Sequence, residues 1–429
     1  MVSVLSRRRF LECAALLSGG VACGFPTLLR GQTAGQKLNI GFIGCGGRGA
    51  ENLTALAGEN VVALCDTNAN NLAASAQQFP KAGTYRDFRK MLEQKDMEAV
   101  VISTPDHTHA VAALAAMRSG RHVYCEFPLT HTVAEARLIA QAAREHKVAT
   151  QMGNQVHSAD ANRLAVEWIR AGIIGAVDDV FCWTDRPTWP QGLTRPVDTP
   201  PVPAHLDWNL WLGPAPERPY HPIYQPANWR GWWDFGNGAL GDMGCNLMDA
   251  AFWALNLGNP SLIEAESTGM TQESAPKASM VCWQFPARGA LSAVRLHWYD
   301  GGKPMPKETA ELAAGIKNGA IFAGSKGHLI LPIGGLPRLM PQPHDFNPPQ
   351  PSLPRSINHH QEWIQACKGG KPAESNFDYA GPLTELILLG AVALRVGKRL
   401  EWDGPNLKAP NVPEAAAFLS HPCRQGWTL

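Results

Sequence analysis

Near the N-terminus, residues 44–49 read Gly-Cys-Gly-Gly-Arg-Gly, which is the pattern G-x-G-x-x-G. An apolar run precedes this pattern, a helical stretch follows it, and a second apolar run ends at Asp66, about 20 residues further on. In such a unit Gly44 permits a tight turn, Gly46 lets the backbone approach a pyrophosphate, and Gly49 lets helix and strand pack closely. The free N–H groups at the start of the helix then face the phosphate charge. The pattern predicts a dinucleotide-binding loop formed by Gly44, Cys45, Gly46, Gly47, Arg48 and Gly49.

The residue type at position 66 decides which dinucleotide is expected. The carboxylate of Asp66 stands where it can accept hydrogen bonds from ribose hydroxyls. The same charge would repel a 2′-phosphate. NAD is therefore favoured over NADP as the cofactor.

Strand and helix patterns continue to alternate up to about residue 157, and polar residues gather where the predicted strands end. Such alternation predicts an α/β fold with a doubly wound parallel sheet, which binds ligands at the C-terminal ends of its strands. An alternative for Asp106, His107 and His109 is that they only cap the next helix. The cofactor contacts expected at these strand ends are Thr104, Pro105, His107, His109, Glu126, Asn154 and Gln155.

The length and charge of the chain limit its organisation and its partners. It has 429 residues, and because single cores rarely exceed roughly 250–300 residues, two domains are expected. The formal net charge of +1 lacks the basic excess of nucleic-acid-binding proteins, so no such partner is expected. His359 and His360 are adjacent and do not share one helix face, and no metal site is predicted.

The first 33 residues resemble a twin-arginine export signal. Residues 6–11 read S-R-R-R-F-L, and the apolar run at 14–22 is too short to span a bilayer. The resemblance predicts a periplasmic protein, exported already folded, with no stable membrane span. One alternative is a disordered basic N-terminus, and another is a lipoprotein anchored at Cys23.

Several blocks along residues 36–429 resemble the Gfo/Idh/MocA oxidoreductases, and especially the exported branch of that family. Besides the glycine loop and Asp66, the matching blocks are residues 103–109, 126–129, 241–246 and 376–383. Members of the family mostly oxidise or reduce a ring hydroxyl of sugars, inositols and related polyols. Relatives in glycoside hydrolase family 109 instead cleave glycosides with tightly bound NAD and no net redox change.

The resemblance also implies the architecture. A Rossmann domain is expected at residues 36–157, and a C-terminal α+β domain with a large, mostly antiparallel sheet is expected at 158–429. The open face of that sheet covers the nicotinamide in the family and often forms an oligomer interface, so a dimer or tetramer is expected. Residues 381–396 read as a tail helix that packs back near the Rossmann domain.

Two positions depart from the family pattern. The E-K-P motif has Phe127 in place of its lysine, and the D-x-x-x-H motif keeps Asp242 but has Asn246 in place of its histidine. Phe127 can neither donate a proton nor stabilise an alkoxide. The Asn246 amide can orient a hydroxyl, but its protonation state cannot cycle near neutral pH. Both groups that usually handle the proton are therefore missing.

Three residues are candidates to replace them. Asp242 can act as an acid or base, since an apolar pocket raises the pKa of a carboxylate. His157 follows the cofactor edge of the sheet, with the alternative that it only starts a helix. Tyr299 reaches in from the second domain, with the alternative that it is an ordinary aromatic residue of the sheet.

Residues 185–238 form a long insertion rich in Pro, Gly and Trp, and insertions of this length are usually functional. Flat aromatic faces suit the C–H faces of sugar rings, and arginines suit hydroxyls. Arg230, Trp232 and Trp233 are therefore expected to contact substrate, together with Phe127 and Tyr299. The alternative is that the tryptophans only pack the insertion onto the sheet.

The sequence thus predicts an exported NAD-dependent oxidoreductase for a small carbohydrate. The predicted catalytic residues are Asp242, Asn246 and His157. Two alternatives stay open, a catalytically silent homologue that binds NAD and sugar, and a redox-neutral NAD-dependent glycosidase.

Overall fold

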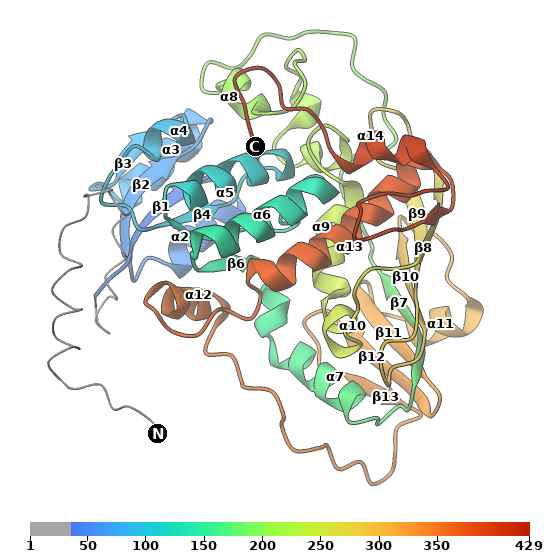
Figure 1. Ribbon diagram of the computed structural model, residues 1–429. Helices are drawn as coiled ribbons and strands as arrows, with labels where there is room; N and C mark the ends of the chain where they lie inside the picture. Colours follow the sequence, from blue (N-terminus) through green and yellow to red (C-terminus); the bar gives the residue numbers. More distant parts are fainter. Residues whose placement is uncertain (1–35) are drawn as a thin grey trace, which may run out of the picture. The chain divides into compact units, whose positions relative to one another are not determined.

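A computed structural model describes residues 36–429, which contain two β-sheets (Figure 1). The predicted export signal at residues 1–33 lies outside the described residues, so it stays a prediction. The domain boundary expected at residue 157 likewise stays a prediction.

The first sheet has six parallel strands in the order β3-β2-β1-β4-β5-β6. Strands β4 and β5 are buried along their whole length, as expected where helices cover both faces of a parallel sheet. This strand order is that of the Rossmann fold and confirms the predicted doubly wound sheet. The strands are β1 (Asn39–Ile43), β2 (Asn60–Cys65), β3 (Gly83–Tyr85), β4 (Ala99–Ile102), β5 (His122–Cys125) and β6 (Thr150–Met152). The helices that connect them are α2 (Arg48–Ala55), α3 (Ala69–Gln78), α4 (Phe88–Met91), η1 (Asp106–Thr108), α5 (His109–Arg118) and α6 (Val133–His146).

The second sheet has eight strands in the order β13-β12-β11-β7-β10-β9-β8-β14. Only β7 and β10 are parallel neighbours within this described sheet, so the large, mostly antiparallel sheet is confirmed. Its strands are β7 (Val177–Trp183), β8 (Leu262–Thr268), β9 (Ala278–Phe285), β10 (Val294–Asp300), β11 (Gly319–Gly324), β12 (Gly327–Pro332), β13 (Arg338–Met340) and β14 (Leu400–Glu401). The helices of this part are η2 (Gln155–Ser158), α7 (Asp160–Arg170), α9 (Gly238–Leu247), α10 (Asp249–Ala254), α11 (Lys307–Leu312), α12 (His359–Cys367), α13 (Phe377–Val396), η5 (Pro413–Ala415) and α14 (Ala416–Leu419).

Helix α13 packs against elements of both sheets, contacting α6 and β6 as well as β8 and β9. It begins at Phe377, earlier than the predicted residue 381, because the Asn376 side chain caps the backbone N–H of Asp378. Gly381 lets α13 pack closely on α6, since an added Cβ would lie 3.0 Å from the Cβ of Ala140. This is the one described helix that is long and apolar enough to cross a membrane, and 78% of its apolar window is buried inside the protein.

The long insertion folds into short helices around a hydrophobic cluster of its own. The helices are α8 (Trp208–Leu212), η3 (Pro222–Tyr224) and η4 (Asn228–Gly231). The cluster consists of Leu206, Trp208, Trp211, Leu212, Ala215, Tyr224, Trp229, Trp232 and Phe235. Four of the insertion's tryptophans therefore pack into a core of the insertion itself rather than onto the sheet.

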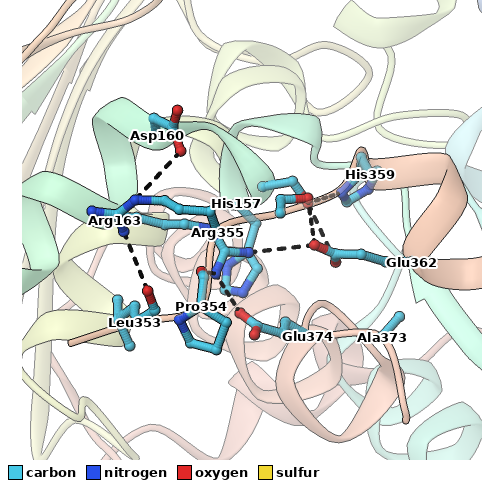
Figure 2. A network of polar contacts seen from close by, with 12 residues as sticks. His157, Asp160, Arg163, Leu353, Pro354, Arg355, His359, Glu362, Ala373 and Glu374 are labelled. Atoms are coloured by element: carbon cyan, nitrogen blue, oxygen red, sulfur yellow. Dashed lines mark hydrogen bonds and ion pairs between the residues drawn. The ribbon is translucent and has the colours of Figure 1, made fainter. Parts of the chain in front are cut away.

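A buried arginine holds the extended segment at residues 341–358 (Figure 2). Arg163 on α7 is fully buried, and its Nη1 donates to the carbonyl oxygen of Pro354 at 2.6 Å. The same guanidinium pairs with Glu374 at 3.0 Å and with Glu362 at 3.4 Å. One side chain thus ties together α7, the extended segment and α12.

Candidate functional site

A cavity of about 790 Å³ lies at the C-terminal edge of the parallel sheet and reaches to helix α9. Its wall combines the glycine loop, the ends of β2, β4 and β5, part of the insertion, and one face of α9. Of the residues predicted for the site, those that line the cavity are Gly44, Gly46, Gly47, Arg48, Asp66, Thr104, Pro105, Glu126, Phe127, Arg230, Asp242 and Asn246.

The glycine loop has the shape that a pyrophosphate needs. Gly44 has a φ of +85°, and an added Cβ would lie 2.6 Å from the carbonyl oxygen of Ser103. A Cβ at Gly49 would lie 2.0 Å from the Gly44 carbonyl oxygen, so only glycine lets α2 approach the loop. A Cβ at Gly47 would meet no described atom within 4 Å, and α2 begins there without a side-chain cap. The start of α2 is therefore open to an anion.

Asp66 is positioned by its own neighbourhood. One carboxylate oxygen accepts from the backbone N–H of Asn68 at 2.7 Å, and the other accepts from the N–H of Cys45 at 2.9 Å and from Asn71 at 3.3 Å. Burial raises the pKa of Asp66, and these hydrogen bonds oppose that rise. A carboxylate oxygen can accept more than one hydrogen bond, so Asp66 can also bind ribose hydroxyls. Loop and carboxylate together fit a dinucleotide.

We expect Asp66→Ala to weaken NAD binding about 10- to 100-fold, because a hydrogen bond to a charged group contributes roughly 1.5–3 kcal/mol. Titration calorimetry with NAD measures this effect. NADP should lose less affinity than NAD, since the repulsion of its 2′-phosphate disappears. The control is Glu93→Ala, at a side chain that is 68% exposed. Identical NAD titrations for wild type and Asp66→Ala would contradict the assignment.

Glu126 closes the floor of the cavity beside the glycine loop. It is buried, accepts a hydrogen bond from Asn52 at 2.8 Å, and lies 3.9 Å from Arg48. Burial raises the pKa of Glu126 to about 7. An added Cβ at Gly153 would lie 2.5 Å from this carboxyl group. The neighbouring Phe127 presents an apolar wall to the cavity.

Helix α9 brings Asp242 and Asn246 to the cavity, since residues four apart lie on one helix face. Arg230 donates from Nε to one oxygen of Asp242 at 2.8 Å. The Nε of Arg186 lies 3.7 Å from the other oxygen. Asp242 is therefore bracketed by two guanidinium groups, and Arg230 in turn lies over the Trp229 ring at 4.3 Å.

Asp106, for which helix capping was one expectation, is a further carboxyl group of the cavity and lies close to Asp242. Its side chain caps neither η1 nor α5, is 4% exposed, and forms a hydrogen bond with the side chain of Asn237. An added Cβ at Gly241 would lie 3.8 Å from its Oδ2, which places Asp106 beside α9. Burial raises the pKa of Asp106 well above its ordinary value, Arg230 opposes this rise, and Asp242 adds to it. Its place directly after Pro105, at the end of β4, was the available signal.

Two predicted cofactor contacts, His107 and His109, do not line the cavity. Both are buried, and their ring nitrogens face backbone carbonyl oxygens. The partners of His107 are Phe235 and Trp211 of the insertion, and burial lowers its pKa to about 4. His107 thus ties the edge of the parallel sheet to the insertion, and His109 ties the segment after β4 to the segment after β5.

Three further predicted residues, of which Asn154 and His157 are buried, do not line the cavity. His157, proposed as catalytic, is 1% exposed, and its Nδ1 lies 2.9 Å from the carboxylate of Asp249. Asn154 also donates to Asp249, at 3.2 Å. Gln155 donates to the hydroxyl of Tyr124 at 3.0 Å. The structure therefore does not bring His157 and Asn154 to the predicted site, because the buried Asp249 engages them instead. Gln155 does not line the cavity itself, but its side chain also bonds to Glu126 of the cavity wall.

The predicted sugar contacts Trp232, Trp233 and Tyr299 lie outside the cavity as well. Trp232 is fully buried in the insertion's cluster, and Trp233 donates to the carbonyl oxygen of Thr271 at 3.3 Å. Tyr299 packs with Trp183 and Ile321 in a hydrophobic cluster of the second sheet. Cys45 and Gly49 belong to the glycine loop but do not line the cavity.

Two family models match the chain. One, described as an oxidoreductase family with an NAD-binding Rossmann fold, matches residues 38–154. The other, described as the C-terminal alpha/beta domain of the oxidoreductase family, matches residues 177–429. The chain belongs to the Gfo/Idh/MocA oxidoreductase family. Its two sheets are thus the family's two parts, and the first is the NAD-binding fold.

Among curated Gfo/Idh/MocA relatives, levoglucosan dehydrogenase of Pseudarthrobacter phenanthrenivorans is 26% identical over 227 residues, 50% of this chain and 50% of that protein. A glycosyl hydrolase family 109 protein of Shewanella pealeana is 29% identical over 201 residues, 40% of this chain and 44% of that protein. The chain therefore spans about half, or less, of the length of the curated relatives it matches.

Solved structures share the Gfo/Idh/MocA fold at low sequence identity. The WlbA dehydrogenase of Bordetella pertussis, in complex with NADH and UDP-GlcNAcA, is 19% identical with a TM-score of 0.63, covering 86% of this chain and 99% of its own. Levoglucosan dehydrogenase in complex with NADH and levoglucosan is 19% identical with a TM-score of 0.60, covering 85% and 99%. At this identity the likeness shows the fold.

Proposed function

We propose that this chain is an NAD-dependent oxidoreductase for a ring hydroxyl of a sugar or sugar derivative, with carboxyl groups in place of the family's lysine and histidine. One observation carries the proposal. A single cavity is lined both by the dinucleotide-binding loop with Asp66 and by the polar group of Asp106, Asp242 and Asn246.

The cofactor would be held by the first half of this lining. The open start of α2 at Gly47 accepts the pyrophosphate, and Asp66 accepts hydrogen bonds from ribose hydroxyls. When bound, NAD supplies the two-electron hydride acceptor for the carbon that bears the hydroxyl. Phe127 forms an apolar wall, which helps to exclude water.

The second half of the lining handles the hydroxyl and its proton. Asp106 takes the hydroxyl proton on a carboxylate oxygen as the alcohol becomes a carbonyl, and it returns the proton in the reverse direction. Asp242 faces guanidinium nitrogens with both oxygens, so its part is to orient a hydroxyl together with Asn246. Two carboxyl groups in such different surroundings suit different roles.

The substrate class is supported by the relatives' names. One matched relative is a levoglucosan dehydrogenase, and several are inositol 2-dehydrogenases. All of these name small polyhydroxylated rings. The cavity of about 790 Å³ has room for such a ring beside a nicotinamide.

The test is product analysis. NAD-loaded protein is incubated with pyranoses, inositols, anhydrosugars and glycosides, and the products are identified by mass spectrometry. A sugar product that has lost one hydride and one proton supports the proposal. No product from any sugar, while NAD stays bound, would instead favour the silent homologue.

A redox-neutral glycosidase is a second candidate. Glycosyl hydrolase family 109 proteins are among the relatives. In addition, the insertion and the C-terminal tail both contribute to the cavity lining near Asp66, which suits a cofactor that stays bound. Release of the aglycone without net change in bound NAD would favour this candidate over a dehydrogenase.

Export by the twin-arginine route to the periplasm and assembly into a dimer or tetramer also remain proposals. The twin-arginine pattern at residues 6–11 supports export. The proposed dimer or tetramer rests on the family resemblance. Substitution of Arg7 and Arg8 by lysine should abolish export of the full chain. A monomer in light scattering would contradict the second.

A further inference from the structure

The last residues of the chain return to the insertion. The backbone N–H of Arg424 donates to the carbonyl oxygen of Pro214 at 2.9 Å. The guanidinium of Arg424 donates to Gly213 O at 3.1 Å, to Asn209 Oδ1 at 2.6 Å and to Asn209 O at 2.8 Å. Figure 1 shows the tail after α14 running to α8. These bonds anchor the tail beside α8.

From this anchor the tail places Trp427 against the Rossmann sheet. The Trp427 ring lies 5.8 Å from that of Phe88, and the guanidinium of Arg89 lies over it at 4.3 Å. Arg89 also donates to the carbonyl oxygen of Gly426 at 3.2 Å. Trp427 lines the cavity on the same side as Asp66 and Phe88.

The insertion reaches the same end of the cavity. The N–H of Ala69 donates to His205 O at 2.7 Å, and the N–H of Asp207 donates to Thr67 O at 2.9 Å. Arg86 donates to Thr67 O and to His205 O and so joins the two segments. Leu206, between these contacts, lines the cavity.

Two segments that are distant in sequence thus cover the end of β2, where Asp66 marks the ribose position. In a Rossmann fold the pyrophosphate lies at the first helix and the ribose at the acidic residue after β2. A bound purine would therefore lie beyond Asp66, at the end of the cavity that Leu206 and Trp427 line. An aromatic ring and an aliphatic side chain are suitable faces for a flat base.

We propose that Trp427, held by Arg424, is an adenosine-binding residue that with Leu206 clamps the adenosine half of the cofactor and slows its release. This inference rests on the proposed NAD site but not on catalysis. It adds a contact from the C-terminal tail to the proposed NAD site.

Cofactor release tests the clamp in the full mature protein. NADH-loaded protein is mixed with excess NAD, and the nicotinamide fluorescence reports dissociation. We expect Trp427→Ala to release NADH about 10- to 100-fold faster, the range for removing one base-stacking ring. Arg424→Ala should also release NADH faster than the wild type. Trp427→Phe keeps an aromatic ring and should therefore release NADH at a rate close to that of the wild type.

Reduced nicotinamide mononucleotide, which lacks adenosine, is the matched ligand control. Its affinity should be equal in wild type and Trp427→Ala. Equal NADH release from both proteins would overturn the clamp, and so would equal weakening of both ligands, which indicates a general change of fold. If wild type binds no NADH, the proposed cofactor itself fails, and the clamp fails with it.

Discussion

Asp106→Asn should lower the rate of sugar oxidation about 10²- to 10⁴-fold, the usual contribution of a positioned general base. Asparagine keeps the shape of the side chain and its contact with Asn237, but it cannot accept a proton. NAD affinity should be unchanged, because Asp106 lies beside α9 rather than at the ribose position. The measurement is steady-state kinetics with the sugar identified by product analysis.

The pH profile separates Asp106 from the other carboxyl groups of the cavity. An acceptor works only when deprotonated, so kcat/KM for oxidation should rise with pH through the pKa of Asp106, which burial places above the ordinary range. Asp106→Asn should lose this limb, and Glu126→Gln, at a group with a pKa of about 7, should keep it. Loss of the limb in Asp242→Asn with its retention in Asp106→Asn would make Asp242 the acceptor.

Arg163→Ala should reduce the free energy of unfolding by about 3–5 kcal/mol, because it removes one partner of a buried ion pair. The substitution leaves the carboxylate of Glu362, 13% exposed, without its guanidinium partner, and it strips a donor from Pro354 O. The extended segment at 341–358 would lose its anchor on α7 (Figure 2). Urea unfolding followed by circular dichroism measures the change.

Lys90→Ala is the control for this prediction. Its ion pair with Glu93 joins side chains that are 70% and 68% exposed, and exposed pairs contribute little. A shift below about 0.5 kcal/mol is expected there. If Arg163→Ala were as stable as Lys90→Ala, the anchoring role of Arg163 would be wrong.

The parallel sheet and its loop could be predicted from local sequence because each signal lies within one βαβ unit. Gly44 and Gly49 have close neighbours that exclude a Cβ, and Asp66 lies at the end of the next strand, as their spacing indicates. The second sheet followed from the family resemblance rather than from periodicity. Helix α13 was placed by its apolar run, although its start at Phe377, after the Asn376 cap, was missed.

The positions of several side chains depend on contacts with residues distant in sequence, which local patterns do not predict. His157 has the residue type of an acid or base, but Asp249, distant in sequence, holds it in a buried network. Trp232 was expected to contact substrate, yet the insertion forms a hydrophobic core of its own and buries this side chain. Trp427 had no signal, since only the folded tail brings it to the Asp66 end of the cavity.

The central claim is hydride transfer without the family's lysine and histidine, and the nicotinamide absorbance of the NAD-loaded protein tests it most directly. The protein is mixed rapidly with each sugar of the panel, and the absorbance of reduced nicotinamide is followed over one turnover. We predict a rise with at least one sugar, at a rate that Phe127→Ala lowers less than Asp106→Asn does. NAD that stays bound and oxidised with every sugar would contradict the account.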